Sequence, residues 1–423
     1  MSSPHPDILT NLRHNYIYNI LDGAFFGLAL GFASFVTVIP LFVSTLTSSA
    51  VLIGLIPAIH NMGWQLPQLI IANRVSQQSR YKPMVLVFTL QERLPFLILA
   101  LIAWLVPMIG SKSALTLTFI LLIWQGLGGG FTANPWQSMI AKIMPSDRRG
   151  TFYGIQSAAA NLLASLSAIA AGYILSVLNS PQDFVLCFFL AFSAMAISWL
   201  ALAQTREPVI LPSTPPMGQK EFWQKLMTIL RRDVNFRWFL MVRMLSQFAL
   251  MGFAFYTVYA VQVLGMSEVT VGILTSVLLA TQIIINPLMG WIGDRWSHRS
   301  LMAIGALSAT ASGMIAWLAP DPGWFYLVFI LAGVANVSVW TVGLAMILNF
   351  GNETERPAYI GLANTLIAPA SILAPLLGGW LAERAGYPVA FITSAIAGVI
   401  TALILYTSVR DPLILTPIKK STR

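Results

Sequence analysis

Most of the chain consists of apolar segments long enough to cross a membrane. A helix needs about 20 apolar residues to span the hydrocarbon core of a bilayer. Hydrophobic residues make up 57% of the 423-residue sequence and charged residues only 9%, more apolar surface than a water-soluble core could bury. We therefore predict an all-α membrane protein with twelve transmembrane helices, at 16–40, 51–72, 83–106, 115–141, 151–178, 184–203, 238–264, 269–293, 301–319, 324–349, 359–382 and 387–408.

The distribution of positive charge predicts how these helices are oriented. Of the 24 lysine and arginine residues, 20 fall in segments on one side of the predicted membrane. Such an excess marks the cytoplasmic side, so both termini are expected in the cytoplasm of a multi-pass protein of the cytoplasmic (inner) membrane. The net charge of +9 then reports topology and does not indicate a nucleic-acid partner.

A polar stretch at 204–237 divides the helices into two sets of six, at 1–203 and 238–423. Its first part carries four prolines, which favour an extended linker: Pro208, Pro212, Pro215 and Pro216. Its second part alternates apolar and basic residues at helical spacing, with Phe222, Trp223, Leu226, Ile229 and Leu230 opposite Lys220, Lys225, Arg231 and Arg232. This pattern predicts a short helix on the inner membrane surface that tethers the two halves.

The two halves repeat one another. Adding 221 carries Asn73-Arg74 onto Asp294-Arg295, and adding 207 carries Arg149 onto Arg356. Two parallel six-helix halves are typical of secondary transporters, in which the substrate binds near the membrane midplane between the repeats.

A charged turn at 290–299 lies between the eighth and ninth apolar segments. Its Gly290, Asp294, Arg295 and Arg299 resemble the G-x-x-x-D-[RK]-x-G-[RK]-[RK] signature of the major facilitator superfamily, with Ser297 in place of the glycine and His298 in place of a basic residue. The first-half copy has Asn73 where the signature has aspartate, and it keeps Arg74. The run Pro145-x-x-x-Arg149-Gly150 is also similar to a family pattern.

This resemblance implies a twelve-helix transporter of the major facilitator fold. It also implies a cytoplasmic gate formed by Gly290, Asp294, Arg295 and Arg299 together with Asn73, Arg74, Arg149 and Arg356. The family's proton-coupled drug exporters often carry a glycine-rich proline motif on the fifth helix. Here that helix has Gly154 and Gly172 but no proline, and a partial echo lies at Pro375-x-x-Gly378-Gly379. The drug-exporter branch therefore stays open.

Four charged residues fall inside apolar segments: Asp22, Glu92, Arg93 and Arg243. Charges in a membrane are costly, so each needs a partner or a function. Asp22 has two candidate partners, Arg93 in its own half and Arg243, its counterpart in the repeat, across the interface. Either Asp22 or Glu92 could carry a proton, or a cross-half pair could break during transport. The alternative is a static ion pair, which we favour for Glu92 and Arg93 because the third helix of this superfamily tends to lie outside the cavity.

Amide side chains recur on the second and eighth helices. Asn61 and Gln65 correspond to Gln282 and Asn286, and each pair lies on one helix face at spacing i, i+4. Unpaired amides are costly in hydrocarbon, so these faces are expected to meet protein or a wet cavity. Substrate contact and interhelical hydrogen bonding both remain open. Further candidates are His60, Gln125, Asn134, Asn336 and Asn364, with Trp124, Trp136, Trp340 and Tyr256 as apolar cavity walls.

These features favour a secondary active transporter that works by alternating access. Amide and aromatic candidates suggest a small neutral or amphipathic solute, and proton-coupled efflux through Asp22 or Glu92 is the preferred version. Sugar or other small-solute uptake, lipid translocation and a non-transporting membrane sensor or scaffold are the alternatives. We expect a monomer with the solute, protons and the lipid bilayer as its partners, and no enzyme activity, cofactor, metal or nucleic acid.

Overall fold

The computed structural model describes residues 6–35, 37–211, 217–266 and 268–412, and this part of the chain is helical. Three of the four linker prolines, Pro212, Pro215 and Pro216, lie outside the described residues. Within them, nine helical stretches are long and apolar enough to cross a membrane. The longest, α6 (Lys82–Ile143), contains two spans because the chain turns back at Gly110, whose φ of 78° favours glycine.

The first two spans are interrupted helices. The first consists of α2 (Leu12–Phe32) and α3 (Val38–Leu46), and the second of α4 (Ala50–Gln65) and α5 (Pro67–Ser76). Proline removes an N–H donor and is tolerated in the first turn of a helix, which is why α5 begins at Pro67. With these two spans and both legs of α6, the described chain accounts for the twelve expected crossings.

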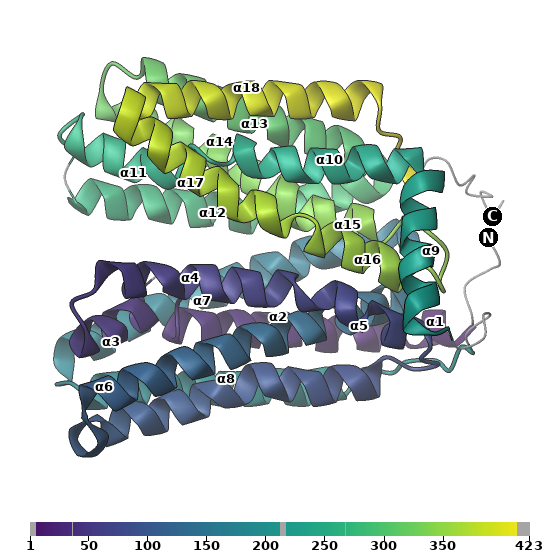
Figure 1. The fold of residues 1–423 in the computed structure, drawn as a ribbon, viewed down its shortest axis with the longest axis horizontal. Coiled ribbons are helices and arrows are strands. Elements are labelled where there is room, and N and C mark those ends of the chain that lie inside the picture. The colour runs from purple at the N-terminus through teal and green to yellow at the C-terminus, as the bar shows by residue number, and fades with distance from the viewer. Residues whose placement is uncertain (1–5, 36, 212–216, 267, 413–423) are drawn as a thin grey trace.

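The halves form two layers of helices (Figure 1). After α6, the first layer ends with α7 (Arg149–Val177) and α8 (Gln182–Ala203). The second contains α10 (Val234–Ala249), α11 (Phe253–Gln262), α12 (Glu268–Arg295) and α13 (His298–Leu318). It continues with α14 (Phe325–Val337), α15 (Gly343–Ile347), α16 (Arg356–Thr365), α17 (Ala368–Ala385) and α18 (Tyr387–Thr407). A π-helical turn, Ser338–Val342, joins α14 to α15.

The first described helix, α1 (Pro6–Thr10), and the end of α18 lie at one end of the bundle, where α9 (Gln219–Arg232) crosses from one layer to the other (Figure 1). We call this the linker end. Phe222, Leu226 and Ile229 of α9 are buried in an apolar core to which both layers contribute. Part of the apolar face of α9 is therefore covered by protein, whereas Trp223 is 43% exposed; contact of this helix with the membrane surface stays a prediction.

The two layers approach most closely where α7 crosses α12. A Cβ atom added at Gly290 would lie 2.1 Å from the carbonyl oxygen of Gly150, and one at Gly154 would lie 2.3 Å from that of Asn286. Small residues allow such backbone contacts between membrane helices. The ribbons of the two layers converge at the linker end and are farther apart at the opposite end (Figure 1).

Candidate functional site

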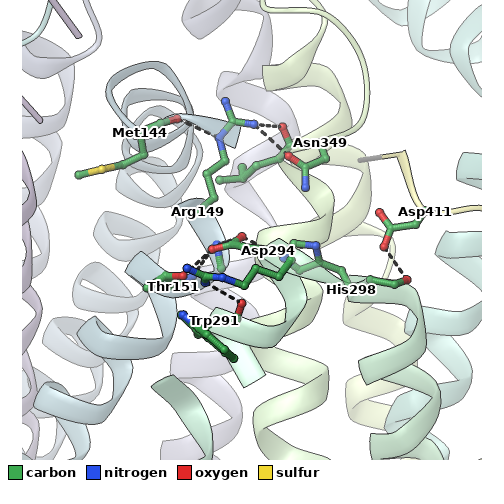
Figure 2. Close-up of polar contacts among 12 residues, drawn as sticks. Met144, Arg149, Thr151, Trp291, Asp294, His298, Asn349 and Asp411 are labelled. Atoms are coloured by element: carbon green, nitrogen blue, oxygen red, sulfur yellow. Dashed lines mark hydrogen bonds and ion pairs between the residues drawn. The ribbon is translucent and has the colours of Figure 1, made fainter. Parts of the chain in front are cut away.

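Asp294, at the end of α12, caps the N-terminus of α7 in the other half (Figure 2). Its Oδ1 accepts a hydrogen bond from the Gly150 backbone N–H at 2.8 Å, and its Oδ2 accepts from the Thr151 N–H at 2.6 Å and hydroxyl at 2.7 Å. A helix N-terminus presents unpaired N–H groups and a partial positive charge. It therefore stabilises a carboxylate both by hydrogen bonding and by electrostatic attraction. Asp294 thus joins the two halves at the linker end.

The other residues of the charged turn support this contact from within their own half. The fully buried His298 ring places Nε2 3.6 Å from Asp294 Oδ1. Ser297 Oγ and the Arg299 backbone N–H both donate to Asp411 near the end of α18. Arg295 lies exposed at the surface, its guanidinium 4.2 Å from the centre of the Trp291 ring. The turn is therefore anchored to its own half while Asp294 reaches across.

Two arginines from opposite halves meet at the C-terminal end of α15. Buried Arg149 donates to the carbonyl of Leu348 at 2.9 Å and to Asn349 Oδ1 at 3.1 Å (Figure 2). Arg356 donates to the same Leu348 carbonyl at 3.1 Å. Cations are stabilised where unpaired helix carbonyls gather, so Arg149 forms a second contact between halves beside Asp294.

The first-half copy of the turn does not reproduce this arrangement. Asn73 donates to the carbonyl of Met217 and to Gln219 Oε1, both in the linker region, at 3.2 Å each. Arg74 is exposed. An amide cannot supply the negative charge that a helix N-terminus favours, and here it contacts the linker. The contacts of the two turns are thus asymmetric between the halves.

Buried amides continue the contact between halves away from the charged turn. Asn364 on α16 donates to Gln68 Oε1 at 2.7 Å and to Gln137 Oε1 at 3.2 Å. Asn134 donates to the carbonyls of Gln68 and Pro357. The hydrogen bonds from Asn364 to Gln68 and Gln137, and from Asn134 to Pro357, join the two halves and would be lost if the halves separated here.

The paired amides of the second and eighth helices have different surroundings. Gln65 accepts from the Ser371 hydroxyl at 3.0 Å across the halves, whereas Asn61 is exposed. Gln282 accepts from Asn161 of the other half at 3.2 Å, and Asn286 pairs with Thr341. Three of the four therefore make hydrogen bonds to other helices in this conformation, and Asn61 is free of them.

The remaining polar candidates lie farther from the interface. The His60 ring stacks on Phe35 with centroids 3.9 Å apart, and its Nδ1 lies 3.0 Å from Gln125 Oε1. Asn336 is half-buried, and the described residues provide no polar partner for it. His60 therefore makes a packing contact, and Asn336 is an amide without an assigned partner. The two residues do not belong to one site.

Asp22 pairs with Arg93 inside the first half. Arg93 Nη2 donates to Asp22 Oδ1 at 3.0 Å, and the Ser198 hydroxyl donates to the same oxygen at 2.6 Å. Arg93 Nε also donates to the Met195 carbonyl at 3.2 Å. Of the two partners that the sequence left open, the structure selects the one in the same half.

Arg243, the counterpart of Asp22 in the repeat, has no acidic partner among the described residues. It is 1% exposed, and it donates to the Val339 carbonyl at 2.8 Å and to Asn364 Oδ1 at 3.4 Å. The Val339 carbonyl belongs to the π-helical turn, which departs from regular helical pairing. Through Asn364, this buried cation is linked to the amide network between the halves.

A cavity of about 220 Å³ lies within the first half beside Glu92. Its lining comes from α2, α4, both legs of α6, α7 and α8 and includes Asp22, Phe26, Trp64, Glu92, Trp136 and Ser157. The third predicted helix thus borders this cavity, which lies among the helices of the first half. The expectation that this helix lies outside the cavity between the halves stays a prediction, and Arg93 does form an ion pair.

A family model described as the Major Facilitator Superfamily matches residues 90–267 and 252–422. The chain belongs to this superfamily. The superfamily structures share its fold at low identity: the E. coli fucose:proton symporter FucP has a TM-score of 0.73 at 16% identity over 94% of this chain and 100% of that chain. The human organic anion transporter MFSD10 has a TM-score of 0.72 at 13% identity over 93% and 99%.

Curated relatives match part of the chain. The vesicular acetylcholine transporter of Mus musculus is 33% identical over 139 residues, which are 33% of this chain and 26% of that protein. Multidrug resistance protein 1 of Bacillus subtilis (strain 168) is 24% identical over 149 residues, 35% of this chain and 38% of that protein. The chain thus spans less than two fifths of either relative. Like other members of the superfamily, it is a multi-pass membrane protein.

Proposed function

We propose that this superfamily member exports a small amphipathic solute by alternating access, in exchange for protons. With the linker end in the cytoplasm, the structure is the state closed toward the cytoplasm. The observation that carries this proposal is the set of contacts that Asp294 and Arg149 make across the halves at that end. Such contacts stabilise one of the two states between which a transporter alternates.

Glu92 supports proton coupling. Its side chain is 6% exposed, lines the cavity, and has neither a hydrogen bond nor an ion pair among the described residues. An unpaired buried carboxylate is strongly destabilised when ionised, so it tends to take up a proton when its surroundings become dry. Asp22 already has Arg93 and Ser198 as partners, which makes Glu92 the better proton carrier.

The named relatives agree with a small amphipathic solute. One is a vesicular acetylcholine transporter and another a multidrug resistance protein. The aromatic lining of the cavity, with Phe26, Trp64 and Trp136, is compatible with a solute that has apolar surface. A sensor or scaffold that had lost transport would not need an unpaired carboxylate beside such a cavity.

Flux into liposomes tests this proposal. Purified protein is reconstituted, a pH gradient is imposed, and uptake of a panel of radiolabelled solutes is followed. Exchange with protons predicts accumulation when the interior is acidic, whereas cotransport predicts accumulation when the exterior is acidic. Gradient-driven accumulation of no member of a broad panel would contradict transport.

Replacing Glu92 with glutamine should uncouple transport from the proton gradient. At saturating solute we expect gradient-driven accumulation to fall at least tenfold, while exchange of labelled for unlabelled solute continues, because the variant keeps its shape but cannot carry the proton. Glu383→Gln is the matched control, since it removes an exposed carboxylate at the end of α17. Full gradient-driven accumulation by the Glu92 variant would show that another group carries the proton.

A further inference from the structure

We infer that the cavity beside Glu92 binds the positively charged head of an organic cation, with Glu92 as its counter-ion and the indoles of Trp64 and Trp136 as its walls. This inference rests on the proposed transport function and adds the class of the solute. It begins from Glu92, a buried acid to which the described residues provide neither a hydrogen bond nor an ion pair.

The charges around Glu92 are already committed to one another. Arg93, the adjacent cation, donates to Asp22 Oδ1 at 3.0 Å, to Ser198 at 2.7 Å and to the Met195 carbonyl at 3.2 Å. Arg243 lies in the other half, where it bonds Val339 and Asn364. When ionised, Glu92 therefore needs a cation that the described part of the protein does not supply.

The Glu92 carboxylate and the Trp64 indole border the same space. A Cβ atom added at Gly129 would lie 2.9 Å from Glu92 Oε1 and 3.5 Å from Trp64 Cδ1. Glycine leaves this space open on the second leg of α6, and Trp136 lines the cavity from the same leg. A cation in the cavity would thus meet a carboxylate and aromatic rings together.

This combination of groups fits an organic cation. Indole rings attract cations through their π-faces, and the attraction grows when water is excluded. The cavity of about 220 Å³ corresponds to roughly seven water molecules at ~30 Å³ each, which suits a headgroup and not a whole drug-sized molecule. The apolar remainder would extend toward the interface, where Trp64 meets Trp340 with ring centres 6.4 Å apart.

Other ligand classes fit less well. The described residues hold no group of three or more His, Cys, Asp or Glu side chains that could bind a metal ion, and hard metal cations need six or more oxygen ligands. An anion would face Glu92 and Asp22, of which only Asp22 is neutralised by an arginine. A large, weakly hydrated organic cation avoids both problems.

Proton and organic cation should then exclude one another from Glu92. The charged groups that face it are Asp22 from α2 and Arg93 from its own helix, and these two neutralise each other. Of the two acids in the described lining of the cavity, Glu92 is the one that no ion pair compensates. Its protonation removes that negative charge, so affinity for the cation should fall as the pH falls. This competition would couple solute release to proton uptake.

Binding to purified protein tests this inference without requiring transport. Calorimetric titration in detergent is carried out with benzyltrimethylammonium and with 2,2-dimethyl-3-phenylpropan-1-ol, a neutral alcohol of similar size. For the wild type we expect the dissociation constant of the cation to rise at least tenfold between pH 8 and pH 5, and that of the alcohol to stay within twofold. Equal binding of the two probes at pH 8, or a cation affinity independent of pH, would overturn the inference.

Two variants localise the effect. At pH 8, Glu92→Gln should weaken cation binding at least tenfold, and Gly129→Ala should do the same by placing a methyl group against Oε1 while it keeps the acid. Controls are Glu383→Gln, which removes an exposed acid, and Gly172→Ala, whose added Cβ would meet nothing within 4 Å. Unchanged binding by both cavity variants would place the cation elsewhere. Binding that depends on Glu92 without any proton-driven flux would retain this site and reject the transport proposal, whereas flux without such binding would do the reverse.

Discussion

Replacing Asp294 with asparagine is expected to open the linker end, whereas Asn73→Asp should leave it closed. Asp294 accepts three hydrogen bonds at the N-terminus of α7, from Gly150 N–H and from the N–H and hydroxyl of Thr151. Hydrogen bonds to a charged group contribute about 1.5–3 kcal/mol each, and the helix terminus adds up to ~2 kcal/mol. Because an amide keeps one acceptor, we expect a net loss of about 2–4 kcal/mol, a shift of roughly 30- to 1,000-fold toward the open state.

Distances between spin labels measure this shift. Labels at Gln78 and Thr407 report on the linker end, because both side chains are exposed there and belong to different halves. The native Cys187 is buried and can be replaced by alanine. The asparagine variant should shift the distribution to longer distances, and Asn73→Asp, whose side chain contacts the linker region and Gln77 of its own half, should match the wild type. Equal effects of the two substitutions would mean that the turn specifies topology and does not hold the gate.

Replacing Asp22 with asparagine is expected to destabilise the first half strongly. The substitution would leave Arg93, 4% exposed, without its counter-charge. Removing one partner of a buried ion pair costs about 3–5 kcal/mol. Glu92→Gln should instead cost less than about 1 kcal/mol or stabilise the protein, because it removes a buried charge that has no partner.

Denaturation of the purified protein compares the two adjacent acids. Thermal unfolding should show a lower midpoint for Asp22→Asn and a midpoint near that of the wild type for Glu92→Gln. The double variant Asp22→Asn/Arg93→Gln should be more stable than the sum of its single variants predicts, since each single change leaves one charge unpaired. Additive effects in the double variant would contradict a stabilising pair between these residues.

The helices could be predicted from sequence because length and hydropathy decide what crosses a membrane. The breaks within the first two spans were harder to locate from the sequence than the spans themselves. In the second span, α4 continues past Pro57 and the break comes at Leu66. The sequence pattern of the linker helix predicted which of its residues are apolar, but not that Phe222, Leu226 and Ile229 pack into the protein while Trp223 stays exposed. An amphipathic pattern does not distinguish a lipid surface from the apolar core that buries Phe222.

The candidate site could be predicted only in part. Their charge inside predicted membrane helices identified Asp22, Glu92, Arg93 and Arg243 as candidates. Which of these residues form ion pairs depends on how each helix is rotated about its axis, and the sequence does not specify that rotation. Several partners carried no signal of their own: Ser198 and Thr151 are ordinary hydroxyls, and Gln68 and Gln137 are two amides among many. Among these partners, Gln68 stood near a residue already singled out, three positions after Gln65 in the predicted second span.

Alternation between two states is the central claim, and it is tested by two label pairs measured in wild-type protein in liposomes. One pair, Gln78 and Thr407, reports on the linker end, and the other, Lys112 and Arg384, is exposed on the two halves away from that end. Distances are measured at pH 5 and pH 8. We predict that populations at the two ends shift in opposite directions, one pair lengthening as the other shortens. Distances that stay fixed at both ends, or that lengthen together, would contradict alternating access in this protein.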